Sequence, residues 1–147
     1  MSVTRIAITM SFVAGLAGAA QASVSGALGK RVGSVQAAAF GAIVAAVLLV
    51  GLAVLTGRGP GIADVFRQPA WLLISGVFGA GIVLTLAYAP PRIGTFAAVA
   101  LMIAGQLLAG ALIDGFGWLG TERIPLTAYR VIGLILLTAG AALTLKR

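Results

Sequence analysis

Residues 32–57 read VGSVQAAAFGAIVAAVLLVGLAVLTG, a stretch with no charged side chain. A helix needs about 20 predominantly apolar residues to cross the hydrocarbon of a bilayer, and this stretch exceeds that length. The pattern recurs along the chain, with a charged residue at each end of every uncharged run. The other long uncharged stretches are residues 6–29, 68–91 and 93–113. These stretches predict four membrane-spanning helices.

The last apolar stretch, residues 131–145, is shorter and lies between Arg130 and Lys146. We expect a fifth helix that begins near Leu126, with the Arg130 side chain reaching back to the membrane surface from its first turn. The sequence thus predicts an all-α polytopic membrane protein with five transmembrane helices in a single transmembrane domain, residues 1–147. The expected helices are residues 6–28, 34–56, 69–89, 93–113 and 126–145.

The composition excludes several classes of protein. Charged residues make up 9% of the chain, whereas a soluble domain carries about 25%, so a soluble globular fold is excluded. The net charge is +7, but the basic residues are scattered between apolar runs and not clustered, which argues against nucleic acid as a partner. The chain has no Cys and no His, which removes zinc sites, thiol chemistry and imidazole catalysis. We therefore expect no enzyme, no metal site and no cofactor.

The N-terminal segment has one alternative interpretation. Arg5, an apolar run and Ala20-Gln21-Ala22 together resemble a signal peptide with its cleavage site. We favour a retained helix, because few charges precede the run and because the run continues through Leu28.

The distribution of positive charges predicts no preferred orientation in the membrane. The rule that cytoplasmic loops carry more Lys and Arg compares the two sides of the membrane, and here five of the ten fall on each side. The balance favours insertion in both orientations or an orientation fixed by a partner, with chance as the third explanation. The side of the N-terminus carries Arg5, Arg58, Arg67, Arg123 and Arg130, and the other side carries Lys30, Arg31, Arg92, Lys146 and Arg147.

Because the expected number of spans is odd, the charge balance also indicates how two chains pair. Many carriers consist of two inverted repeats, and a unit with five spans acquires that architecture only by pairing antiparallel with another chain. We expect the chain to be one half of an inverted-repeat transporter, as an antiparallel homodimer or paired with a five-span homologue.

A few polar residues lie within the expected spans. Gln21 and Gln106 need hydrogen-bonding partners in hydrocarbon, so we expect them to face protein or a wet cavity, as structural contacts or as ligands of a solute. Gln106, Gly110 and Asp114 follow at intervals of four residues on one helix face. We expect a weakly polar substrate cavity lined by Gln21, Ser25, Tyr88 and Gln106.

Asp114 and Arg130 flank the longest loop, on the same side of the membrane. They form an ion pair or line a vestibule, or each is a solvated border charge. No acid lies deeper in a span, so Asp114 is the candidate for any coupled proton or cation.

Glycines predict where helices approach one another. Gly133 and Gly140 are seven residues apart and share a helix face that suits a dimer interface, while Gly76 and Gly79 permit close packing in the third span. Ordinary close packing, without a hinge or a special role, is the alternative for each.

Several motifs together resemble a known family. They are Gly18-Ala-Ala-Gln21, Pro69-Ala-Trp71, Gly105-Gln-Leu-Leu-Ala-Gly110 followed by Asp114, and Arg130-Val-Ile-Gly133. In these motifs, in length and in five spans, the chain resembles the YdcZ-like family of bacterial membrane proteins, within the drug/metabolite transporter superfamily. The resemblance implies a half-transporter of the bacterial inner membrane that pairs to move a solute. The related four-span small multidrug resistance proteins use a glutamate in their first helix, where this chain has only the neutral Gln21.

We therefore expect a small-solute transporter that works as an antiparallel dimer by alternating access in the lipid bilayer. The uncharged lining suits a neutral or zwitterionic metabolite. The alternative is a non-transporting accessory or assembly subunit whose Gln and Gly residues serve packing alone.

Overall fold

The computed structural model describes residues 3–145, so the basic residues Lys146 and Arg147 lie outside the described range. All regular secondary structure in residues 3–145 is helical, which confirms the all-α class. The chain forms two compact units that divide between Arg92 and Ile93.

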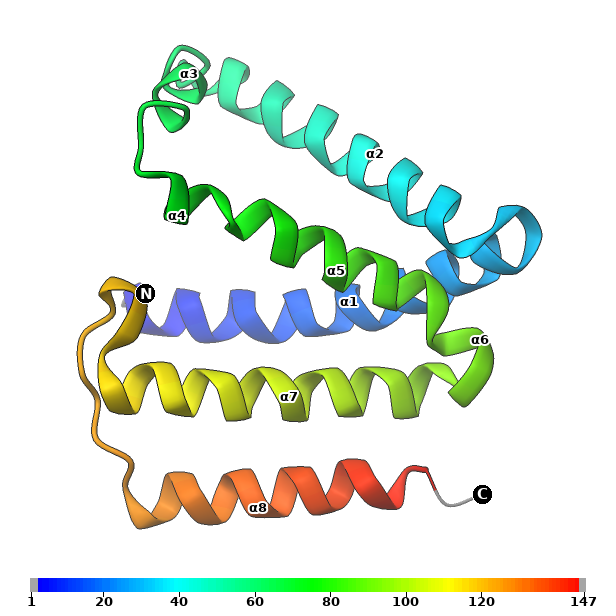
Figure 1. Cartoon of the computed structure of the whole chain (residues 1–147), viewed down its shortest axis with the longest axis vertical. Coiled ribbons are helices and arrows are strands. Elements are labelled where there is room, and N and C mark those ends of the chain that lie inside the picture. Colours follow the sequence, from blue (N-terminus) through cyan, green and yellow to red (C-terminus); the bar gives the residue numbers. More distant parts are fainter. Residues whose placement is uncertain (1–2, 146–147) are drawn as a thin grey trace. The chain divides into compact units, whose positions relative to one another are not determined.

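Three long helices build the N-terminal unit; two short helical segments lie between the second and the third, and one follows the third (Figure 1). The long ones are α1 (Val3–Val32), α2 (Ser34–Leu55) and α5 (Ser75–Tyr88), which all contact one another. The short ones are α3 (Gly61–Val65), α4 (Ala70–Leu73) and α6 (Pro90–Ile93).

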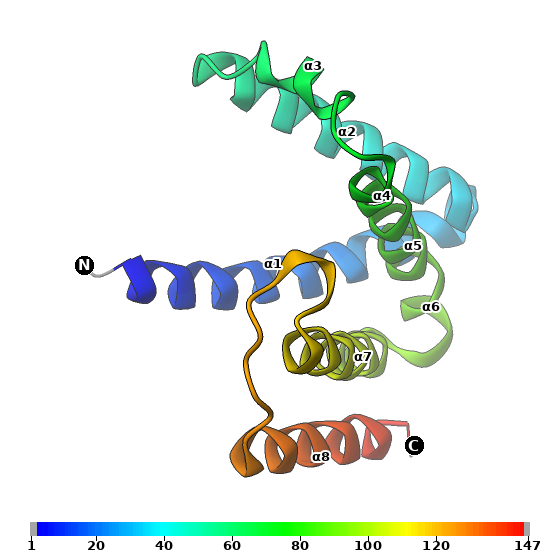
Figure 2. The ribbon, with the colours of Figure 1, turned by 60° about the vertical axis from the view of Figure 1, so that its left-hand side comes forward.

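Small side chains form the core of this unit. Ala37 and Ala38 of α2 and Ala87 of α5 are buried together, with Leu28 and Val83 packed against them. This cluster lies where α1 turns into α2, and from there α2 diverges from α1 and α5 (Figures 1 and 2). Helices in lipid associate by close van der Waals contact, so alanine at the crossing allows the backbones to approach.

Two glycines of α1 allow the closest approach to the end of α5 and to α6. A Cβ atom at Gly29 would lie 2.7 Å from the carbonyl oxygen of Ala87, and one at Gly26 would lie 3.0 Å from the Cβ of Pro90. The two glycines are three residues apart and so share a face of α1. This face, with the fully buried Ala22, is the packed stripe of the first helix.

The third expected helix, residues 69–89, is interrupted. Ile74 separates α4 from α5, and the backbone N–H groups of Val77 and Phe78 both donate to its carbonyl oxygen. The segment as a whole, Ala70–Ile93, has 24 residues and is apolar and long enough to span a membrane.

The C-terminal unit consists of α7 (Thr95–Phe116) and α8 (Ala128–Leu143), joined by a loop with a single 3-10 turn at Trp118–Gly120. The two helices run antiparallel and contact each other along their length (Figures 1 and 2). Gly117, with φ 67°, ends α7 in the left-handed conformation. Thr127 caps α8, because its hydroxyl oxygen accepts a bond from the Arg130 backbone N–H.

The tight connections at Gly33 and Gly94 have the same construction. An Arg, a β-branched residue, a glycine and a hydroxyl residue follow one another as Arg31-Val-Gly-Ser34 and as Arg92-Ile-Gly-Thr95. Gly33 has φ 98° and ψ 143°, and Gly94 has φ 86° and ψ 150°. Only glycine adopts this backbone conformation without strain, so a single residue separates the two helices at each connection.

Four helices are long and apolar enough to cross a membrane: Val3–Val32, Ser34–Leu55, Ala70–Ile93 and Thr95–Phe116. The fifth expected helix forms as α8, but its 16 residues place it among the shorter apolar helices. At about 1.5 Å per residue it measures roughly 24 Å, against about 30 Å of hydrocarbon. The expected count of five spans is therefore not established by helix length.

Filling the contact at Gly29 tests the packing of α1. We expect Gly29→Ala to lower the free energy of unfolding in detergent by about 1–3 kcal/mol, because the new methyl group overlaps the Ala87 carbonyl. Gly15→Ala is the control on the same helix, since a Cβ there meets nothing within 4 Å. It should leave stability unchanged or raise it by up to about 1 kcal/mol. Equal stability of the two variants would contradict this packing.

Candidate functional site

A groove with a volume of about 360 Å³ lies between α7 and α8. Helix geometry explains its lining, because residues three, four and seven apart share one face of each helix. Leucines and small residues make up most of the wall, and its polar side chains are Gln106, Asp114 and Arg130. The lining residues are Gln106, Leu107, Gly110, Ala111 and Asp114 from α7, and Arg130, Gly133, Leu134 and Leu137 from α8.

Asp114 and Arg130 form an ion pair at the loop end of the groove. Nη1 of Arg130 donates to Oδ2 of Asp114 at 3.4 Å, and the side chains are 35% exposed for Asp114 and 45% for Arg130. An ion pair this accessible to solvent stabilises a fold by about 1 kcal/mol or less. The sequence left open whether these charges pair. The structure shows that Asp114 and Arg130 pair, and both residues also line the groove.

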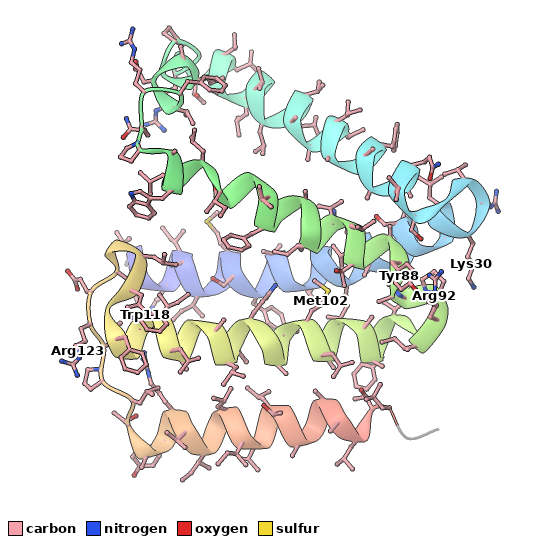
Figure 3. The ribbon with its side chains drawn as sticks, in the orientation of Figure 1. Lys30, Tyr88, Arg92, Met102, Trp118 and Arg123 are labelled. Atoms are coloured by element: carbon pink, nitrogen blue, oxygen red, sulfur yellow. The ribbon has the colours of Figure 1, made fainter. Side chains whose placement is uncertain are left out.

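The loop after α7 packs back onto the end of that helix, which positions Asp114. The backbone N–H of Ile124 donates to the carbonyl oxygen of Asp114 at 2.9 Å, and Nε of Arg123 donates to that of Gly115 at 3.1 Å. Trp118 stacks on Phe116 with ring centroids 4.8 Å apart. Figure 3 labels Trp118 and Arg123 at this end of the unit.

Gln106 lies two helical turns from Asp114 on the same face of α7, about 12 Å along the helix axis. Its side chain is exposed, and no hydrogen bond to it occurs among residues 3–145. An amide in a membrane-spanning helix needs a polar partner, so this side chain is available to water or to a solute in the groove.

A second groove between the same helices, of about 350 Å³, is apolar apart from Thr144. Gly140 lines this groove, whereas Gly133 lines the first. Both glycines therefore face α7, yet a Cβ at either would meet nothing within 4 Å. The same holds for Gly76 and Gly79 in α5, so the dimer interface at Gly133 and Gly140 and the close helix packing at Gly76 and Gly79 stay predictions.

The other expected cavity residues belong to the N-terminal unit. Gln21 is exposed and Ser25 half-buried on α1, and Tyr88 is exposed at the end of α5. The guanidinium of Arg92 lies 3.5 Å from the centroid of the Tyr88 ring and donates to the Tyr88 carbonyl oxygen at 2.6 Å (Figure 3). A shared cavity of these three residues with Gln106 stays a prediction.

The glycines that approach another element most closely, Gly26 and Gly29, were not among the sequence-based candidates. With 21 glycines in the chain, spacing alone does not single them out. The one local signal is their position before the basic turn at Lys30 and Arg31. Among residues 3–145 no group of three or more metal-ligating side chains occurs.

These features define a class of protein. Four helices suited to a membrane, apolar outer surfaces and a partly polar groove belong to a polytopic membrane protein. A family model described as "Putative inner membrane exporter, YdcZ" matches residues 6–143. The chain belongs to this family, which confirms the resemblance carried by its motifs. It is a multi-pass inner-membrane transporter, and the family is one of transport proteins rather than enzymes. No curated protein and no solved structure matches the chain.

Thiol labelling tests whether the groove holds water. The chain has no native Cys, so single substitutions report on one position each. We expect a membrane-impermeant maleimide to label Ala111→Cys, which lines the groove, faster than Ala109→Cys, which lines neither groove of α7. The thiolate that reacts forms only where water reaches the sulfur. Equally slow labelling at the two positions would show that the groove is not hydrated.

Proposed function

We propose that the protein is a small-solute carrier that works as an antiparallel dimer by alternating access. In this proposal each chain contributes five spans, and the groove between α7 and α8 forms part of the solute path. The observation that carries the proposal is that groove, where an amide and an ion pair face apolar walls within a transporter of the inner membrane.

The proposal requires α8 to cross the membrane although it has only 16 residues. A short span is accommodated by local thinning of the bilayer and by flanking side chains that reach the surface. Arg130 lies in the first turn of α8 and pairs with Asp114, which lowers the cost of holding its charge near the hydrocarbon.

The antiparallel arrangement rests on the charge balance. Five Lys and Arg residues on each side give no preferred orientation, so both orientations are expected in one membrane. Two oppositely inserted copies of a five-span chain reproduce an inverted repeat, in which one half rocks against the other around a central site.

Asp114 is the acid through which a coupled proton or cation would act. Of the acids in residues 3–145, Asp64 pairs with Arg67 on the surface, and only Asp114 lines a groove. A coupled ion would compete with Arg130 for the carboxylate. Asp114→Asn would then change the pH dependence of transport, and an unchanged profile would exclude this role.

Solute flux into sealed vesicles tests the function. With the purified protein and a panel of metabolites, we expect uptake of at least one solute and a loss of about tenfold or more in Gln106→Leu, since an amide that binds a solute is replaced by an apolar group. Gln36→Leu is the matched control, because Gln36 of α2 lines neither groove. Folded protein that carries no solute would favour an accessory subunit, whereas full flux in Gln106→Leu would show that the Gln106 amide does not bind the solute.

A further inference from the structure

We infer that the groove between α7 and α8 binds a zwitterion, with the carboxylate of the solute on Arg130 and its ammonium group on Asp114. The inference names the substrate class of the proposed carrier and rests on that proposal for the statement that the bound molecule is cargo. It also assigns the Asp114 carboxylate to the cargo in place of a coupling ion.

The geometry of the ion pair is the first observation. One nitrogen of Arg130 meets one oxygen of Asp114 at 3.4 Å, and neither side chain makes another hydrogen bond within residues 3–145. A guanidinium has five N–H donors and a carboxylate has two acceptor oxygens, so most of their capacity is unused. A ligand with both charges can bind these free donors and acceptors through strong charge-assisted hydrogen bonds.

The charge balance within the groove is the second observation. Asp114 and Arg130 are the charged residues of the lining, so the groove as a whole is neutral. A solute with a single charge would pair with one of the two side chains and leave the charge of the other without a partner in the groove. A zwitterion compensates both charges at once, and this favours it over an anion or a cation of the same size.

The remaining lining of the groove indicates the size and the side-chain chemistry of the solute. Leu107, Ala111, Leu134 and Leu137 form apolar walls beyond the ion pair, and Gln106 offers an amide about 12 Å from Asp114. The volume of about 360 Å³ is near the lower limit for ligand pockets. These dimensions fit a small amino acid with an uncharged side chain, either apolar or with a neutral polar tip.

Binding and flux of matched solutes test the inference. The probes are radiolabelled leucine and glutamine, each compared with its N-acetyl derivative, which lacks the cation, and with its decarboxylated amine, which lacks the anion. With the full-length protein in detergent and in vesicles, we expect at least one amino acid to bind and to be carried about tenfold better than both of its singly charged analogues.

Charge variants connect this preference to the ion pair. Asp114→Asn and Arg130→Gln should each weaken binding of the amino acid about tenfold or more, whereas the double variant Asp114→Arg with Arg130→Asp should recover part of it. Asp64→Asn is the control, because it removes an acid from the exposed Asp64–Arg67 pair, which lines no groove. It should bind like the native protein.

The outcomes separate this inference from the proposed function. Flux of a neutral or singly charged solute, with amino acids carried no better, would overturn the inference and support the carrier. Binding of an amino acid that depends on both charges, without flux of any solute, would support the site and contradict the carrier. Absence of both binding and flux, or binding unaffected by the charge variants, would overturn the inference.

Discussion

Hydrocarbon offers no partner to backbone N–H and C=O groups, and this constraint governs the whole structure. Only 9% of the residues are charged, too few for a surface exposed to water. The long segments therefore lie in the bilayer and form helices, which satisfy their backbone groups internally. The connections at Gly33 and Gly94 use a single residue each, which keeps exposed backbone between helices to a minimum. Few polar side chains lie within the spans, and each of them needs a specific hydrogen-bonding partner.

The two units meet this constraint in different ways. In the N-terminal unit Ala87, Gly26 and Gly29 bring helices into direct contact, and most of the large apolar side chains are exposed. In the C-terminal unit α7 and α8 contact each other but leave two grooves, and Cβ atoms at Gly110 and Gly133 would meet nothing. The space that a solute needs is therefore found beside glycines of the C-terminal unit whose Cβ positions are open, next to an ion pair that is weak enough to open.

The sequence predicts the helices well because charge-free length is a direct physical requirement for a span. Helical periodicity likewise places Gln106 and Asp114 on the same face of α7. The interruption at Ile74 comes directly before Ser75 and Gly76, a pair that favours a kink, and the expected uninterrupted helix 69–89 did not take this local signal into account. The contact of Gly29 with Ala87 depends on tertiary packing. The pairing of Asp114 with Arg130 depends on the path of the loop between them, which no spacing rule determines.

The most direct test of the antiparallel arrangement is the location of both termini, measured with reporters fused to either end of the otherwise native chain. A chain with five spans and no charge bias should show each terminus on both sides of the membrane in comparable amounts, with the two ends of one molecule on opposite sides. A single fixed orientation would contradict assembly from two copies of this chain in opposite orientations. Both termini on the same side of the membrane would contradict five spans.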